Sequence, residues 1–187
     1  FDYGYAQVVR EYDLFGRIKR ASFIGDDVKR ARWKVGGYSF SEFVYEDGNQ
    51  IEARYYGEDG KLVLRADLGY AVIKMKYDEY SRNISETYFD VKELPVVSTE
   101  YRCAGIEYEY DKMYNKTVLR YLGPDGKHMT RDDTGITETR REYDFAGNIV
   151  KESYFVIDGE KLKPAVNKDT GYASFEDAFE NGNWIEG

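Results

Sequence analysis

Apolar and polar side chains alternate along several short segments of the chain. Residues 70–77, for example, have the sequence YAVIKMKY, in which Ile73, Met75 and Tyr77 alternate with Lys74 and Lys76. A period of two residues is typical of a half-buried β-strand. Residues 148–155 predict a second strand, and residues 62–64 a short third one. No segment keeps the apolar spacing of an amphipathic helix without an interrupting turn signal, so the pattern predicts strands and no helix.

Glycine, asparagine and aspartate separate the predicted strands. The sequence Asp-x-x-Gly-Asn, as at residues 144–148, supplies a side-chain acceptor and a residue that tolerates positive φ. Hairpin turns need both features. Asp-Gly pairs follow at residues 59–60, 125–126 and 158–159. These turns predict a building block of two or three antiparallel strands.

The building block recurs along the chain. A Tyr-Asp or Tyr-Glu pair begins at residues 12, 45, 77, 110 and 143, with a Phe-Glu variant at 179, so the intervals are 33, 32, 33, 33 and 36 residues. Eight residues earlier lies a glycine or an arginine, at positions 4, 37, 69, 102, 135 and 171. We predict an all-β fold of tandem antiparallel β-hairpin repeats of about 33 residues, five full and one partial. Because one hairpin cannot bury a face alone, the repeats are expected to stack in an elongated array, one domain over residues 1–187.

Three departures from the repeat predict local irregularity. Residues 93–95 are Glu-Leu-Pro where other repeats have Asp-Gly-Lys, which predicts an open turn. Asn115 follows Tyr114 at the Gly-Asn site, so Asn115 is expected to take the positive φ. The connection that contains Pro164 lies near the longest interval and is expected to bulge outward.

Aromatic residues are unusually frequent, with 19 tyrosines and ten phenylalanines. Stacked repeats bring equivalent rings together, and offset stacking adds about 0.5–1.5 kcal/mol per ring pair. The tyrosines of the Tyr-Asp pairs, called anchor tyrosines below, and the second-strand aromatics are therefore predicted to form ladders. Six aromatics lie outside the ladder positions and are candidate ligand-binding residues: Phe15, Tyr80, Tyr114 and Phe145 in the turns after the anchor, and Trp33 and Tyr101 in the connections between repeats.

Composition excludes several classes of protein. A net charge of −8 argues against a nucleic-acid partner, and no apolar run is long enough to predict membrane insertion. With one cysteine, Cys103, and one histidine, His128, the sequence predicts no disulfide, no zinc cluster and no histidine-based triad. No nucleophile, base and orienting group are found together, so we expect neither enzymatic activity nor a cofactor or metal.

The repeat resembles known bacterial families. Residues 11–18 (EYDLFGRI) and 142–149 (EYDFAGNI) resemble the Y-D-x-x-G-[RN]-[LI] core of bacterial YD-repeat (Rhs-type) proteins, which are secreted or surface β-hairpin arrays. Residues 55–61 (YYGEDGK) are similar to the hairpins of Gram-positive cell-wall-binding and glucan-binding repeats. The resemblance implies an extracellular or bacterial cell-surface location, and it transfers no ligand-binding residue.

Two interpretations of the function remain open. In the first interpretation, the chain is a non-catalytic module that binds glycan or cell-wall polymer through turn aromatics. Sugar rings stack on aromatic faces, and several weak sites together give multivalent binding. Alternatively, it is a structural spacer or a protein-interaction scaffold attached to another domain, with edge strands that contact another protein. A contiguous exposed row of turn aromatics favours binding, whereas buried rings leave only the scaffold.

Overall fold

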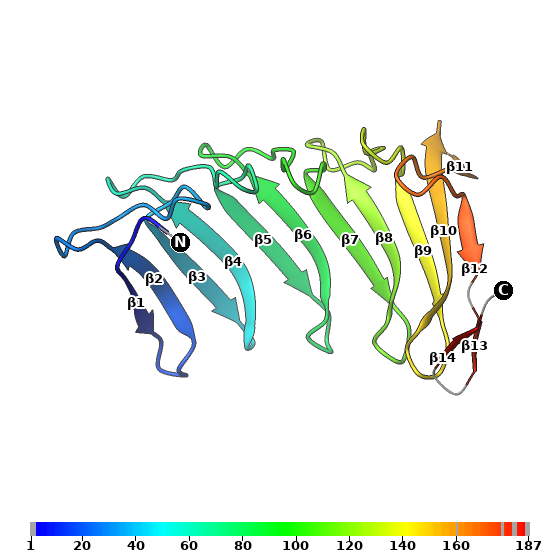
Figure 1. Ribbon diagram of the computed structural model, residues 1–187, viewed down its shortest axis with the longest axis horizontal. Helices are drawn as coiled ribbons and strands as arrows, with labels where there is room; N and C mark the ends of the chain where they lie inside the picture. The colour runs from blue at the N-terminus through cyan, green and yellow to red at the C-terminus, as the bar shows by residue number, and fades with distance from the viewer. Residues whose placement is uncertain (1–2, 160, 177, 181–182, 186–187) are drawn as a thin grey trace. The chain divides into compact units, whose positions relative to one another are not determined.

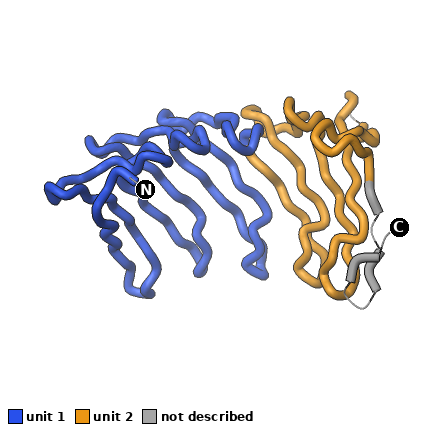
Figure 2. The backbone as a smooth tube through the Cα atoms, in the orientation of Figure 1, with its two compact units in different colours: residues 1–104 blue, residues 105–187 orange. Residues whose placement is uncertain are grey.

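The computed structural model describes residues 3–159, 161–176, 178–180 and 183–185. Every regular element among these residues is a β-strand (Figure 1), which confirms the predicted all-β fold of antiparallel hairpins. The described part of the chain holds no helix that could cross a membrane. Residues 1–104 and 105–187 form two compact units, which are described one at a time (Figure 2). That the repeats form one elongated domain stays a prediction.

The first unit is built from successive hairpins. Its strand pairs are β1 (Gln7–Tyr12) with β2 (Ile18–Ile24), β3 (Phe40–Glu46) with β4 (Asn49–Tyr56), and β5 (Val72–Tyr77) with β6 (Asn83–Phe89). Neighbouring hairpins pair over only three residues, 20–22 with 40–42 and 52–54 with 72–74. The turn ends of the hairpins therefore lie beyond the region in which the strands of neighbouring hairpins pair through their backbones.

The second unit repeats this arrangement. β7 (Gly105–Tyr110) pairs with β8 (Lys116–Leu122), and β9 (Glu138–Tyr143) with β10 (Ile149–Asp158). β8 and β9 join over residues 118–120 and 138–140. β10 also pairs with β11 (Lys161–Pro164) and β12 (Ser174–Glu176). β13 (Ala178–Glu180), which contains the Phe-Glu variant of the anchor pair, and β14 (Asn183–Ile185) form a separate two-stranded sheet.

A β-bulge recurs opposite the anchor tyrosine. Tyr12 pairs with Ile18 while Glu11 pairs with Arg20, which leaves Lys19 of β2 unmatched. The same shift falls at residues 51, 84, 117 and 150. Bulges bend a strand and increase its twist. Because each bulge lies at the same register position, the hairpins share one local bend, with the period that the sequence predicts.

An aspartate organises most of the hairpin turns. Asp13 Oδ1 accepts the backbone N–H groups of Phe15 and Arg17 at 2.8 and 2.9 Å, and Oδ2 accepts Arg17 Nε at 2.7 Å. Asp78, Asp111 and Asp144 form the same turn, with Arg82, Asn115 and Asn148 in the position of Arg17. The residue four positions after the aspartate is arginine or asparagine in these turns, and its side chain donates a hydrogen bond to the aspartate Oδ2.

The prediction of an open turn at residues 93–95 is wrong. Glu93 has a φ of 58° and its N–H donates to the carbonyl of Asp90 at 3.1 Å, the bond that Gly60 makes in the preceding repeat. The Asp90 carboxylate accepts the N–H groups of Lys92 and Leu94 and so closes the turn without glycine.

Two further local predictions are wrong. Tyr114, and not Asn115, has the positive φ, 69°, because Asn115 takes the extended position whose side chain binds Asp111. The segment that ends at Pro164 does not bulge outward but forms β11, with Pro164 opposite Phe155. Pro164 is the last residue of this strand, where a missing N–H is tolerated.

Aromatic rings form a continuous series along the first unit, but its members differ from those predicted. The aromatic after the repeat glycine alternates with the first aromatic of the second strand, in the order Tyr5, Phe23, Tyr38, Tyr55, Tyr70 and Tyr88, with successive centroids 4.6, 5.5, 4.9, 6.1 and 4.9 Å apart. The anchor tyrosine Tyr45 does not join the series. Its hydroxyl instead donates to the carbonyl of Ile18 in the preceding hairpin, at 3.0 Å. The ladder prediction thus holds for the second-strand aromatics and is wrong for this anchor.

Candidate functional site

The tips of four hairpins carry exposed apolar side chains. Phe145 is 93% exposed and Phe15 is 82% exposed, although both are large aromatics. Side chains that protein packing leaves this accessible are available for a partner. The set, called the tip residues below, comprises Leu14, Phe15, Tyr80, Met113, Tyr114 and Phe145.

The aspartate turn explains why these side chains are exposed. The aspartate carboxylate and the residue four positions later bind each other, and the residues between them form the outward loop. Phe145 is the first of these loop residues, Phe15 and Tyr80 the second, and Tyr114 the third. Each tip ring thus lies at the turn end of its own hairpin, but the rings do not share one turn position.

The hairpin of β3 and β4 lacks a tip residue. Its turn has positive φ at Asp47 and Gly48, 48° and 85°, as in a two-residue hairpin loop. This loop is one residue shorter than the aspartate turns, which accounts for the 32-residue interval, and it interrupts the row between Phe15 and Tyr80. In the second unit the turns that carry Tyr114 and Phe145 are neighbours, since the position that a Cβ would occupy at Gly147 is 3.7 Å from Asn115 Oδ1.

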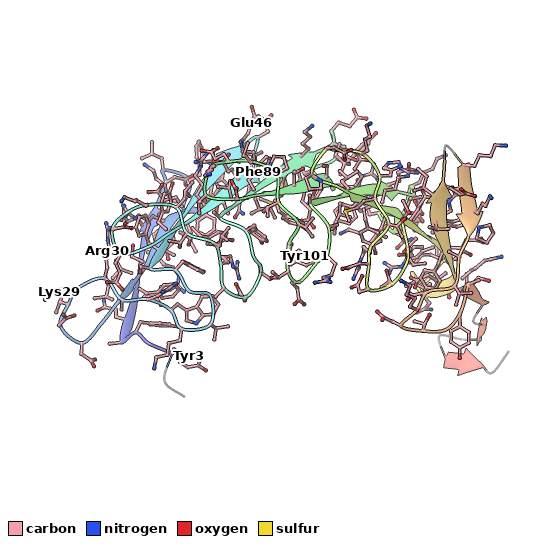
Figure 3. The ribbon with its side chains drawn as sticks, turned by 90° about the horizontal axis from the view of Figure 1, so that it is seen from above. Tyr3, Lys29, Arg30, Glu46, Phe89 and Tyr101 are labelled. Carbon is pink, nitrogen blue, oxygen red and sulfur yellow. The ribbon has the colours of Figure 1, made fainter. Side chains whose placement is uncertain are left out.

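Trp33 and Tyr101 lie in connecting loops and contact the aromatic core. The Trp33 ring is 5.5 Å from Tyr38 and 5.8 Å from Phe23. Tyr101, which is labelled in Figure 3, stacks on Tyr88 with ring centroids 5.2 Å apart and an interplanar angle of 20°. The four predicted turn aromatics are therefore placed at hairpin tips, and the two predicted connection aromatics are placed against the core.

Other connecting loops use arginine for the same contact. The Arg65 guanidinium lies over Tyr55, with Cζ 4.7 Å from the ring centroid, and Arg131 covers Tyr121 at 4.9 Å. An aspartate two residues later orients each arginine through two hydrogen bonds. A side chain from the connecting loop thus covers a second-strand ring in each of these repeats. Sequence reasoning missed this role because tryptophan or arginine fills it at one loop position, whereas Tyr101 fills it from another, three residues later in the loop.

The electrostatics of the core match this packing. Burial raises the pKa of Tyr38 to about 12, so its phenol stays neutral at physiological pH. The hydrogen bond from Arg131 lowers the pKa of Asp133. Burial opposes ionisation of Asp67, but the hydrogen bonds and charge of Arg65 lower its pKa as well. These charged pairs are therefore ionised parts of the scaffold.

Cys103 and His128, the residues singled out in the sequence for their chemistry, belong to different units. Cys103 is buried, and His128 Nε2 is 3.7 Å from Glu107 Oε2. Within the described ranges, no three His, Cys, Asp or Glu side chains gather as a metal site would need. The absence of enzymatic activity stays a prediction.

Comparison with known proteins gives weak similarity in fold. No family model matches the sequence, and no curated protein matches it. A crystal structure of TcdB2-TccC3-TEV has 15% identity and a TM-score of 0.46, and the match covers 94% of this chain and 9% of that chain. The Photorhabdus luminescens Tc holotoxin pore has 13% identity and a TM-score of 0.40, with 94% and 8% covered. The chain thus spans less than a tenth of these toxin chains.

Proposed function

We propose that this chain is a non-catalytic binding module that contacts another protein through its tip residues. The observation that carries the proposal is the exposure of Phe145 and Phe15, 93% and 82%, on turns that are held rigidly by aspartate hydrogen bonds. A rigid turn presents its side chains with little ordering cost on binding. Exposed apolar groups on such turns serve a partner, because they contribute nothing to the core.

The chemistry of the tips favours a protein partner. Leu14 and Met113 are aliphatic and lie beside aromatic tip residues, and the rings occupy different turn positions. Mixed aliphatic and aromatic anchors suit apolar pockets on a protein surface. A regular polymer would be matched better by one ring at one position of every turn. The edge-strand contacts that the sequence suggests stay a prediction.

Glycan binding is a second candidate, supported by the aromatic tips. The strongly exposed rings of Phe145 and Phe15 offer a flat apolar surface on which sugars stack, although the Arg17 guanidinium lies over the Phe15 ring at 5.0 Å. Tyr80 and Tyr114 add phenol groups. An extracellular or cell-surface location, proposed from the resemblance of the Tyr-Asp turns to YD repeats, suits either partner.

The test is photo-crosslinking from the tips. A photoreactive phenylalanine analogue at position 145 or 15 is expected to form specific protein adducts, identified by mass spectrometry. The same analogue at Tyr172, which is also strongly exposed but lies in a connecting loop, is the matched control. Adducts from Tyr172 alone, or none from either tip, would contradict the proposal. Retention on cell-wall glycan that Phe15→Ala with Tyr80→Ala abolishes would favour the second candidate.

A further inference from the structure

A groove of about 660 Å³ lies between the second and third hairpins of the first unit. β4 and β5 pair over residues 52–54 and 72–74, and the register does not continue from there toward the hairpin tips. Near the tips, Asn49 Nδ2 donates to Ser81 Oγ at 3.1 Å and bridges the two hairpins. The groove is therefore bounded by the sheet at one end and by this bond at the other. Its apolar lining consists of Val44, Ile51, Met75, Tyr77 and Ile84.

The gap between the first two hairpins is closed by three side chains. The hydroxyl of the anchor Tyr45 donates to the Ile18 carbonyl, and the Arg17 guanidinium covers the Tyr45 ring, with Cζ 4.6 Å from its centroid. Asp13 holds Arg17 by a 2.7 Å hydrogen bond. A tyrosine, an arginine and a carboxylate thus form one interlocking set.

The groove contains an anchor tyrosine equivalent to Tyr45, but it has no arginine at the position equivalent to Arg17. Tyr77 is the anchor of the third hairpin, and its hydroxyl reaches only the Met75 sulfur, at 3.7 Å, a weak acceptor. Asn49 stands where Arg17 does, because each follows the turn glycine and precedes the residue that pairs with its anchor tyrosine. Asn49 is short and binds Ser81, so no cation of the second hairpin covers Tyr77.

Carboxylates exceed cations around the groove. Glu52 and Asp78 are neutralised by arginines of the same unit, and Lys74 also pairs with Glu52. Of the lining cations, Lys76 alone has no ion pair among the described residues. Three lining carboxylates have none there either: Glu46, Asp47 and Glu79. Glu46 directly follows its anchor tyrosine, as Asp13 does in the first hairpin.

We propose that this groove binds an arginine side chain presented by a partner protein, in the position that Arg17 occupies between the first two hairpins. The guanidinium donates to Glu46 and Asp47 and lies over the Tyr77 ring, while its methylene groups contact Met75. Arginine suits the site better than lysine, because its planar fork binds carboxylates and stacks on a ring at the same time. The groove lining contains no tip residue, although Glu79 and Ser81 flank Tyr80, and the groove adds a second contact to the proposed binding module.

An NMR titration of the full chain tests the proposal. The chain carries ¹³C-labelled Met and Ile methyl groups, and the probe is the peptide acetyl-Gly-Val-Arg-Val-Gly-amide. The control peptide has citrulline, which keeps the shape of arginine without its charge. Saturable shifts are expected at Met75, Ile51 and Ile84, with affinity about tenfold weaker for the citrulline peptide. Equal affinity for the two peptides, or no saturable shift at these methyl groups, would overturn the proposal.

Matched variants locate the bound arginine. Asn49→Arg places an arginine beside Glu46 and is expected to abolish peptide binding, whereas the neutral Asn49→Gln retains it. Glu46→Gln is expected to weaken binding about tenfold, and Glu58→Gln, an exposed glutamate in the turn after β4, leaves it unchanged. Undiminished binding by both Asn49→Arg and Glu46→Gln contradicts the proposal. No variant changes a tip residue, and photo-crosslinking from positions 15 and 145, which lie outside the groove lining, tests the tip surface separately.

Discussion

Replacing Tyr101 with alanine tests whether the rings of the connecting loops belong to the core. Tyr101 is 36% exposed and stacks on the fully buried Tyr88. Full burial of a large apolar side chain contributes about 1.5–3 kcal/mol, so burial of roughly two-thirds of the ring contributes about 1–2 kcal/mol. Stacking adds about 0.5–1.5 kcal/mol. Tyr101→Ala is therefore expected to lower the free energy of unfolding by about 2–3 kcal/mol.

The assay is urea unfolding, monitored by circular dichroism. Tyr80→Ala is the matched control, because Tyr80 is 58% exposed at a hairpin tip, and its loss is expected to cost at most about 0.5 kcal/mol. A double-mutant cycle of Tyr101→Ala with Tyr88→Leu isolates the stacking energy, expected at about 0.5–1.5 kcal/mol. If Tyr101→Ala costs no more than Tyr80→Ala, the ring is not part of the core and the reasoning is refuted.

Three further predictions follow from single positions. Val28 has a φ of 63° and is 81% exposed. Val28→Gly relieves the strain of this left-handed backbone and is expected to raise the free energy of unfolding by about 0.5–1 kcal/mol, measured as a higher urea midpoint. A lower midpoint contradicts this. Hydrogen bonds from the asparagine side chain and backbone of its turn lower the pKa of Asp144, so its stabilisation is complete above the unfolded pKa of about 3.9 and is lost as pH falls through the folded value. Asp144→Asn should therefore flatten the acid limb of a stability–pH curve, and an unchanged limb refutes this. Buried Glu138 accepts hydrogen bonds from Arg120 and Arg140. Glu138→Gln is therefore expected to lower the free energy of unfolding in urea by about 2 kcal/mol, whereas Glu142→Gln, at an exposed glutamate of the same strand, changes it little.

The strands and their faces could be predicted from the sequence because alternation is a local property. Ile73, Met75 and Tyr77 are half-buried, while Lys74 and Lys76 between them are exposed, as the period of two indicates. Tyr70 and Val72 fall on the face of the lysines in this pattern but are buried. The turns were harder to predict, because their decisive group is an aspartate side chain. That carboxylate closes the turn even when the residue with positive φ is not glycine.

The placement of the candidate site residues was predictable only in part. Phe15 and Phe145 follow an aspartate that organises their turn, so the local sequence is enough to place them at a tip. Trp33 and Tyr101 depend on loops that fold back onto a strand distant in sequence, which periodicity does not describe. The groove is recognisable only from strand register, because it results from an asparagine in the place of an arginine.

The connecting loops show why departures from a repeat consensus need a structural explanation before a functional one. Trp33, Arg65, Tyr101 and Arg131 differ in chemistry, yet each covers a ring of the second strand. Trp33, Arg65 and Arg131 share one position, four residues before the repeat glycine, so the single tryptophan among arginines indicates substitution within one packing position, and not a ligand site. In the third repeat that position is Ser98, and Tyr101 covers the ring from three residues later. The tips offer the opposite case, since Leu14, Phe15 and Phe145 there are 82–102% exposed. By this reasoning, binding residues in such an array are those whose position lacks a packing role in every repeat, whatever their side-chain type.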